Sequence, residues 1–356
     1  MYLLLFILLP AVTLTNGKPT LIASLGKLGL DETELDIVTI DPTNGNVSKL
    51  YTLPSLYSLW SDIFVYLRVH SERHRIYILP VNFALGRSFV HELSLVDGHL
   101  INTYNISQNQ LGTPEYYTQW DFDPDTRTLY GLCMNDSNTT LHNNFVWCSV
   151  KFDENGVGKT RYGFYAGPDG DPPGPWPYGR MSMNRNTFST GEYWYTEDND
   201  IFVRSVNTQT GEPGEVIWTI EDKPLINVDP PTFVAVVTGK TKEYAIVMRE
   251  DGWDINTIHL IVVKLKSGVD EELIAKIPTN LIADGPPYAY DPNTDMLYVL
   301  MKTDFKLICD TLVMVNLSQP NSVHTIPAPI KSLYDPAMYF VNDMHLIEWP
   351  PTTPNP

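Results

Sequence analysis

The chain has 356 residues, of which 43% are hydrophobic and 19% charged, so it can bury a core and lacks the composition of a disordered protein. Its 24 basic residues against 42 acidic ones give a formal net charge of −18. This acidity argues against nucleic-acid binding, which needs a basic patch to neutralise phosphates. It favours solubility and attraction of cations or basic partners.

The N-terminal segment has the pattern of a secretory signal peptide. Leu3 to Leu9 is an unbroken apolar run, and small residues follow it up to Gly17. The run is shorter than the roughly 20 apolar residues that span a bilayer, and no later stretch is long enough to do so. We therefore predict a signal peptide over 1–17, one mature domain over 18–350, a short flexible tail over 351–356, and secretion to the extracellular space without a membrane span.

Beyond this segment, a strand pattern recurs along the whole chain. Alternating apolar runs occupy Asp36–Ile40, His91–Val96, Trp147–Phe152, Phe202–Asn207, Ile261–Leu265 and Leu312–Leu317. A Gly-containing turn follows the first five runs and an Asn-containing turn follows the sixth, at intervals of 53 to 58 residues. A period of this length in an all-strand pattern is typical of a β-propeller blade.

Each repeat also contains an earlier run with an aromatic residue, such as Ile76–Leu79 or Leu297–Leu300, and a later short strand. Two connections begin with Asp-Pro-x-Thr, at Asp123 and at Asp291. Asp can hydrogen-bond its own backbone and Pro presets φ, so we predict tight hairpin turns there.

The repeat predicts an all-β fold consisting of a single β-propeller with six four-stranded blades. The C-terminal segment Ser332–Trp349 is expected to add one or two strands to the blade that begins at Leu21, which closes the ring and removes free sheet edges. Because Met338–Phe340 and His345–Trp349 have the pattern of two strands, a seven-bladed ring is the alternative.

Two motifs resemble those of known propellers. The segment Tyr193 to Asp198 is similar to the Tyr-Trp-Thr-Asp signature of six-bladed receptor propellers, with one inserted residue and a Glu. The phrase Asp-Pro-x-Thr-x-x-Leu-Tyr, at Asp123 and Asp291, resembles repeats of many secreted and surface propellers. This resemblance implies the fold and a secreted or surface setting, and neither motif singles out one family.

Five Asn-x-Ser/Thr sequons fall in or beside the expected turns and strand ends, where a glycan would face solvent. They are Asn46, Asn105, Asn135, Asn138 and Asn316. These sites predict an N-glycosylated protein.

The cysteines predict a disulfide bond. Cys133 and Cys148 lie on runs that we expect to be adjacent antiparallel strands, so they can form a bridge if the register puts them opposite each other. Cys309 is then expected to be a buried thiol rather than an intermolecular link. The cysteine spacing does not suggest a zinc or redox site.

Acidic residues give two candidate cation sites. Asp121, Asp123 and Asp125 alternate, so they could share one face of a strand around a cation, although a polar turn between blades explains them as well. Six-bladed hydrolases of the lactonase and paraoxonase type hold calcium in the axial channel with side chains of the inner strands. If this chain resembles them, the metal ligands would come from the strand starts at Asp62, Asp121, Asn184, Asp229 and Asp335.

One aromatic loop is a candidate recognition surface. Trp176 and Tyr178 lie in the Pro- and Gly-rich connection Gly167–Gly179, and exposed aromatics on a rigid scaffold commonly anchor partners. The alternative is a loop folded across the mouth of the channel.

The sequence contains no Gly-x-Ser-x-Gly elbow, no His-Glu-x-x-His motif and no phosphate-binding loop. We therefore hypothesise a secreted acidic glycoprotein that acts as an extracellular binding or matrix component through loops on one propeller face. Its partner would be an extracellular protein, a glycan or a mineral surface, with calcium as the one cofactor considered. The alternative is a calcium-dependent hydrolase of the lactonase or arylesterase type with an axial metal, since propellers host both functions.

Overall fold

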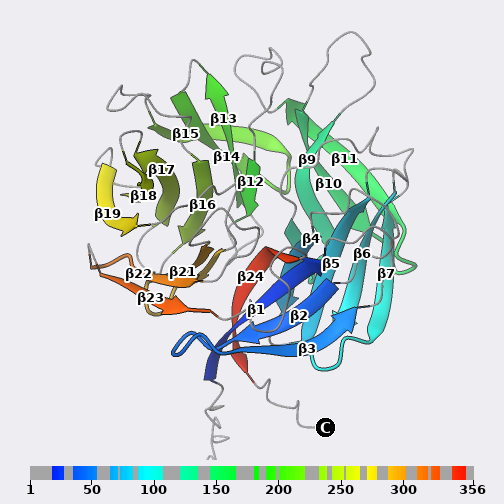
Figure 1. Ribbon diagram of the computed structural model, residues 1–356. Helices are drawn as coiled ribbons and strands as arrows, with labels where there is room; N and C mark the ends of the chain where they lie inside the picture. The colour runs from blue at the N-terminus through cyan, green and yellow to red at the C-terminus, as the bar shows by residue number, and fades with distance from the viewer. Residues whose placement is uncertain are drawn as a thin grey trace, which may run out of the picture.

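The computed structural model describes residues 18–27, 35–53, 65–70, 73–82, 87–106, 121–134, 145–165, 180–183, 190–197, 200–220, 232–238, 243–251, 254–264, 271–278, 288–301, 311–319, 322–328 and 339–349. All regular secondary structure in these ranges is β-strand (Figure 1). Across the same ranges, no helix is long and apolar enough to cross a membrane. The predicted all-β class is confirmed.

The described strands form six antiparallel sheets of four strands each, named A to F here. Sheet A contains β24 (Tyr339–Trp349), β1 (Lys18–Lys27), β2 (Leu35–Ile40) and β3 (Val47–Leu53). Sheet B contains β4 (Val65–His70), β5 (Arg75–Asn82), β6 (Arg87–Ser94) and β7 (Leu100–Ile106). Sheet C contains β8 (Asp121–Asp123), β9 (Thr128–Met134), β10 (Phe145–Phe152) and β11 (Gly158–Tyr165).

Sheet D contains β12 (Arg180–Met183), β13 (Thr190–Glu197), β14 (Asp200–Asn207) and β15 (Glu212–Ile220). Sheet E contains β16 (Thr232–Thr238), β17 (Glu243–Asp251), β18 (Asp254–Lys264) and β19 (Glu271–Pro278). Sheet F contains β20 (Tyr288–Asp291), β21 (Met296–Met301), β22 (Thr311–Asn316) and β23 (Val323–Pro327). The alternating, aromatic-rich runs of the sequence form these strands because one side of each can be buried between sheets.

The sheets are set around a common centre, which is a β-propeller arrangement (Figure 1). The strand that begins each sheet lies innermost, so β24 contacts both β4 and β20, β4 contacts β8, and β12 contacts β16. Since these strands come from different sheets, whatever lies at their ends gathers around the centre.

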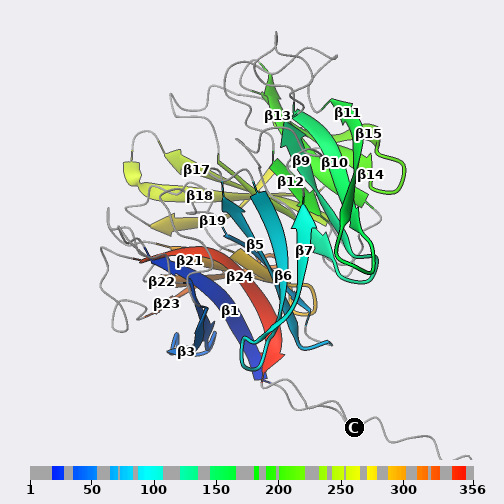
Figure 2. The same ribbon diagram turned by 90° about the vertical axis from the view of Figure 1, so that its right-hand side faces the viewer.

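Sheet A is built from both ends of the chain. β24 pairs with β1 from the Lys18–Trp349 partners to the Lys27–Tyr339 partners, and Figure 2 shows the two strands side by side. This pairing covers an edge of β1 that would otherwise be free to pair with another chain.

The C-terminal segment is one strand, although its sequence suggested two. The register shifts where Ser24 pairs with Asp343 and the next residue pairs with Val341, which leaves Asn342 as a β-bulge. Of the one or two strands predicted for this segment, the described residues 339–349 form one, because the polar pair at 342–343 interrupts the apolar pattern without ending the strand.

Alternation along β1 divides the core. Leu21, Ala23 and Leu25 are fully buried and pack with residues of sheet F such as Leu300. Ile22, on the opposite side, packs with residues of sheet B such as Ile76. The apolar core therefore lies between adjacent sheets, and each sheet is stabilised by its neighbours.

The two Asp-Pro-x-Thr connections are tight turns, as predicted. In each, the first Asp accepts the backbone N–H two residues later, at 2.9 Å for Asp123 and 2.8 Å for Asp291. The same Asp accepts the Thr hydroxyl three residues later, at 2.6 Å in both turns. The turns end in left-handed residues, Arg127 with φ 53° and Asp295 with φ 59°.

The glycine turns connect neighbouring sheets. Gly45, Gly98 and Gly156 have φ of 71° to 74°. A Cβ atom on them would lie 2.1 Å from the Pro327 carbonyl of sheet F, 2.6 Å from the Tyr51 ring of sheet A and 2.9 Å from the Thr103 carbonyl of sheet B, respectively. We call each contact between such a turn and the last strand of the preceding sheet a seam. The repeated glycine is needed for both backbone conformation and close approach.

Candidate functional site

Most of the predicted site residues lie outside the described residues. These are Asp62, Asn184, Asp229, Asp335, Trp176, Tyr178, Asn135, Asn138 and Cys309. Within the described ranges, no group of three or more His, Cys, Asp or Glu side chains is arranged to hold a metal ion.

The topology nevertheless relates the axial candidates to the inner strands. Asp121 is the first residue of β8. In the sequence, Asp62 precedes β4 by three residues, Asp229 precedes β16 by three, and Asp335 precedes β24 by four. Asn184 differs, because it directly follows the end of β12. Asp121 thus begins an inner strand, and the other three acidic residues precede inner strands of three other sheets in the sequence.

The alternating run at 121–125 is used differently from a cation loop. Asp123 is buried and both its carboxylate oxygens serve the turn described above. Asp125 is exposed and pairs with Arg73 of sheet B, whose guanidinium also donates to the Pro124 carbonyl at 3.3 Å. The turn lies between β8 and β9 of one sheet and not between blades, and this polar turn, rather than a shared cation, accounts for Asp123 and Asp125.

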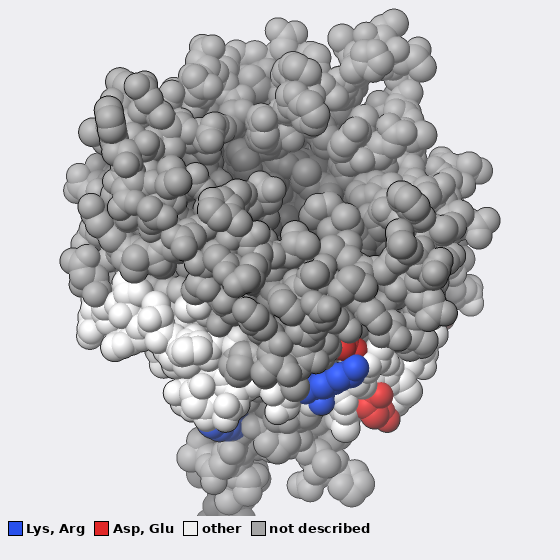
Figure 3. All heavy atoms as spheres, viewed as in Figure 1, with Lys and Arg blue, Asp and Glu red and all other residues white. Residues whose placement is uncertain are grey.

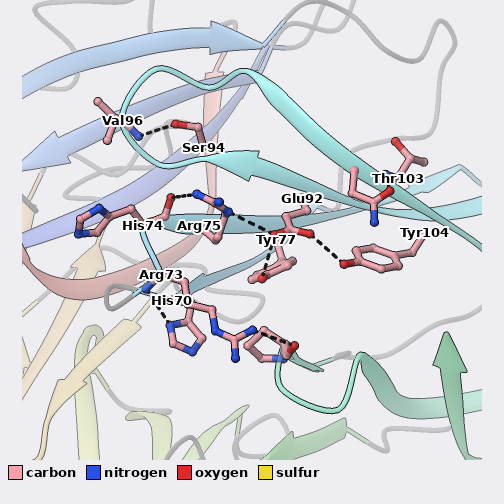
Figure 4. Close-up of polar contacts among 12 residues, drawn as sticks. His70, Arg73, His74, Arg75, Tyr77, Glu92, Ser94, Val96, Thr103 and Tyr104 are labelled. Atoms are coloured by element: carbon pink, nitrogen blue, oxygen red, sulfur yellow. Dashed lines mark hydrogen bonds and ion pairs between the residues drawn. The ribbon is translucent and has the colours of Figure 1, made fainter. Parts of the chain in front are cut away.

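A polar cluster lies on the side of sheet B that faces sheet C (Figure 4). Glu92 accepts the hydroxyl of Tyr104 at 2.8 Å and that of Tyr77 at 3.4 Å, and it pairs with the Arg75 guanidinium at 3.3 Å. Burial, with the Glu92 charge as a second cause, raises the pKa of both tyrosines above the usual value. Both phenols therefore remain protonated donors, and the cluster fixes this face rather than supplying an acid or base.

Aromatic rings cover the same face. Tyr77 and Tyr104 pack against Phe122 of sheet C, with ring centroids 4.8 Å and 5.6 Å apart. Phe152 lies 5.2 Å from Tyr104. The sequence analysis did not predict this cluster. The signal available to it was that Tyr77 and Glu92 fall opposite each other on paired strands.

Among the described residues, His91 and His345 are buried. The His91 ring nitrogen Nδ1 lies 3.0 Å from the Thr103 hydroxyl, and burial lowers the pKa of His91 to about 4. His345, on the inner strand β24, hydrogen-bonds the Leu67 carbonyl of β4. His91 lies on the middle strand β6, and His345 links two sheets. Both rings therefore have a structural role.

A buried carboxylate in sheet A is also fully engaged. Asp36 accepts the Thr52 hydroxyl at 2.6 Å and pairs with the Lys49 ammonium at 2.9 Å, while its side chain is 1% exposed. The partly exposed Lys49 neutralises this buried carboxylate, and the pair holds β2 to β3.

The cysteines are diagonal rather than opposite. Cys133 of β9 pairs with Val146, and Cys148 of β10 pairs with Gly131. The two sulfur-bearing residues are thus two positions apart in register, on the same side of the hairpin. This register is set by the whole strand pair and not by the loop between the cysteines. The bond between Cys133 and Cys148 stays a prediction.

Three sequons fall in the described ranges. Asn46 and Asn105 are exposed, in a turn and near the end of β7. Asn316 is partly buried, and its side-chain oxygen accepts the Ser318 N–H at 2.9 Å. All three lie in or beside turns and strand ends.

The charged side chains of the described residues are mixed in sign on the one face that Figure 3 shows. On the face shown in Figure 3, basic and acidic side chains of the described residues lie near one another at the lower rim. Some acidic side chains are engaged by neighbours, as in the His99–Asp97 contact of 2.7 Å.

Comparisons with known proteins show the fold and no family. No protein-family model matches the sequence, and no curated protein matches it. The structure of a protein from Lactobacillus plantarum is similar with a TM-score of 0.51 at 13% identity, covering 93% of this chain and 100% of that chain.

Two further similar structures have lower TM-scores. The periplasmic gluconolactonase of Pseudomonas aeruginosa has a TM-score of 0.48 at 12% identity, covering 87% of this chain and 100% of its own. A putative 6-phosphogluconolactonase from Bacteroides uniformis has 0.45 at 14% identity, covering 86% of this chain and 81% of its own. At 13% identity, the likeness to the Lactobacillus plantarum protein shows a shared fold and neither a family nor an activity.

Proposed function

We propose that this protein is a secreted β-propeller hydrolase that binds calcium at the mouth of its axial channel and opens small cyclic esters of the lactone class. The observation behind the proposal is that Asp121 begins the inner strand β8, whereas Asp62, Asp229 and Asp335 each precede an inner strand of another sheet by three or four residues in the sequence. Inner strands converge in a propeller, so residues at equivalent ends face one region.

The donor set suits calcium. Carboxylates with the amide of Asn184 are hard oxygen ligands, and calcium takes six to eight such ligands in flexible geometry. When bound, the ion would polarise the carbonyl of an ester and favour attack by water. The chain's own part is to supply these ligands from separate sheets and so to hold the site rigidly. The substrate class is that of the lactonase hypothesis, and lactonases occur among the propellers similar in structure.

The proposal includes the ring itself. We take the six sheets as six blades of one domain over 18–350, closed by the pairing of β1 with β24, which supports a rigid channel. It also includes entry to the secretory pathway, with residues 1–17 as the signal peptide, N-glycosylation, and a disulfide between Cys133 and Cys148. The diagonal register of these cysteines makes non-reducing peptide mapping the direct test of that bond.

Calcium titration followed by thermal melting tests the metal site. The wild-type chain should show a saturable rise in melting temperature with calcium, and Asp121→Asn should weaken calcium binding about tenfold or more by removing one charged ligand. Asp125→Asn is a matched control in the same acidic run, because Asp125 already pairs with Arg73 at the surface. Equal calcium responses in D121N and wild type would contradict the proposal.

Lactone hydrolysis is measured on the same variants. Wild type with calcium should hydrolyse sugar lactones in a pH-stat assay, D125N should match it, and D121N should lose activity together with calcium affinity. A saturable calcium site without activity on any lactone would retain the metal and reject the reaction.

The second candidate function is an extracellular binding or matrix component, acting on a protein, a glycan or a mineral surface. The observation that favours it is the spread of exposed acidic residues over separate described turns, at Asp97, Asp125, Asp153 and Glu154. Distributed carboxylates attract calcium weakly and without a defined stoichiometry. A calcium response that never saturates, with adsorption to a mineral or matrix surface, would support this candidate over the hydrolase.

A further inference from the structure

The seam between sheets B and C holds an exposed apolar side chain next to a sequon. Val157, in the turn between β10 and β11, is 56% exposed. Its backbone forms a parallel bridge with Asn105 of β7, and the Asn105 N–H donates to the Gly156 carbonyl at 2.9 Å. Bridged residues of neighbouring strands lie about 4.8 Å apart, so the valine and the asparagine are immediate neighbours.

The turn holds Val157 in this exposed position. The Val157 N–H donates to the Asp153 side chain at 2.8 Å, and its carbonyl accepts the Asp153 N–H at 3.0 Å. Gly156, with φ 74°, fixes the backbone one residue earlier. The valine cannot turn inward without breaking these bonds, so its apolar surface stays in water unless something else covers it.

Asn105 is itself exposed and begins the sequon Asn105-Ile106-Ser107. We propose that Asn105 carries an N-linked glycan whose first sugars cover Val157 and so span the seam between sheets B and C. The inference rests on the secretion that is part of the proposed function. A tethered glycan needs only a weak contact to cover this surface, because attachment makes the contact intramolecular.

The other described sequons lack such a neighbour. The exposed large apolar residues of the described ranges are Val96, Leu100, Ile101, Val157 and Val216. Asn46 is followed by Val47, which packs against the core between sheets A and F. Asn316 directs its side-chain oxygen to the Ser318 N–H. Asn105 is therefore the described sequon at which loss of a glycan would expose apolar surface.

The experiment begins with glycan occupancy. The chain is produced in a eukaryotic secretory host in two forms, one with its own N-terminus and one with a host signal peptide in place of residues 1–17. Glycopeptide mass spectrometry should find Asn105 occupied in the secreted protein. An unoccupied Asn105, or a protein without any glycan, would overturn the inference. Failure of only the native N-terminus to direct secretion would instead contradict the secretion proposal and leave occupancy of Asn105 measured.

Coupling to Val157 is measured by thermal melting of four secreted proteins: wild type, Asn105→Gln, Val157→Thr and the double variant. N105Q should lower the melting temperature by about 1–2 °C, as a small loss of stability does in a chain of this size. In the V157T background the same loss should fall to half or less, since no valine is left to cover. Ser107→Ala removes the sequon while keeping Asn105 and should lower the melting temperature as N105Q does.

Equal losses of melting temperature in both backgrounds would overturn the covering role. The control N46Q should leave the melting temperature unchanged in both backgrounds.

Discussion

At the residue scale, burial decides the charge state of individual side chains. His91 shows this best: it is 6% exposed between Ile78 and Thr103 in the register of sheet B. Burial disfavours the charged imidazolium, so the pKa of His91 falls to about 4. The ring is neutral at physiological pH and acts as part of the packing between sheets A and B.

This shift predicts a pH dependence of stability. The unfolded imidazole titrates near 6.5, so between pH 6.5 and 4 the unfolded state binds a proton that the folded state excludes. The contribution is fully present above pH 6.5 and is lost as pH falls through that window, by about 1–3 kcal/mol. Urea unfolding at pH 7.5 and 5 should show a smaller difference for His91→Gln than for wild type.

Thr103→Val provides the control for His91. It removes the hydroxyl 3.0 Å from the ring but leaves the ring buried. Because burial lowers the pKa, T103V should be less stable at every pH yet keep the wild-type pH dependence. If T103V also loses that dependence, the hydrogen bond and not burial is the cause.

At the element scale, the sheets share the same turn hydrogen bonds as well as the same strands. In the five described turns between the third and fourth strands of a sheet, the side chain of the residue that starts the turn accepts the backbone N–H two positions later at 2.9 to 3.3 Å. These residues are Asp41, Ser94, Asp153, Asn207 and Asn316. The residue after Ser94, Leu95, donates its N–H to the carbonyl of the left-handed His74 at 3.0 Å, and Leu317 does the same with Asp295 at 2.9 Å. In sheet C the donor to the left-handed Arg127 is Phe152, the residue before Asp153. The two turns at one end of a sheet thus support each other.

The glycine of a seam turn should be hard to replace. Gly156→Ala adds a Cβ 2.9 Å from the Thr103 carbonyl at a residue with φ 74°. We expect a loss of about 2 kcal/mol or more, since the left-handed conformation alone costs roughly 1–2 kcal/mol. Chemical denaturation measures the change. Glu154→Ala, an exposed neighbour in the same turn, should stay within about 0.5 kcal/mol of wild type.

At the scale of the whole molecule, stability depends on the pairing of the chain ends. β24 supplies the inner strand of sheet A, contacts β4 and β20, and carries His345 to the Leu67 carbonyl. Its buried residues belong to the cores on both sides of the sheet, with Met344 toward sheet F and Ile347 toward sheet B. One C-terminal strand therefore holds three sheets together.

Truncation tests this dependence. A chain ending at residue 338 lacks β24 and should lose cooperative thermal unfolding, because the inner faces of sheets A, B and F lose their shared partner. A chain ending at Trp349 keeps β24 and should melt as wild type does, as expected for a short flexible tail. A sharp, wild-type transition in the shorter chain would show that sheet A does not need its inner strand.

The sequence alone predicted much of the fold, for physical reasons that can be named. The period of the glycine turns, the alternation along each run and the Asp-Pro-x-Thr phrases all act over a few residues, so they give strands, hairpins and the four-stranded unit without knowledge of distant contacts. The acidic residues before the inner strands could be named for the same reason, since their phase within the repeat is a local property.

Only the tertiary structure decided what depends on contacts between distant residues. The bulge at Asn342 makes one strand of two apparent ones because β1 pairs across it. The diagonal place of Cys133 and Cys148 follows from the register of a whole strand pair. The Glu92 cluster and the buried His91 arise where two sheets meet, and the exposed Val157 beside Asn105 arises at a seam. Local sequence sets the strands and turns, whereas burial between sheets sets the environment of each side chain.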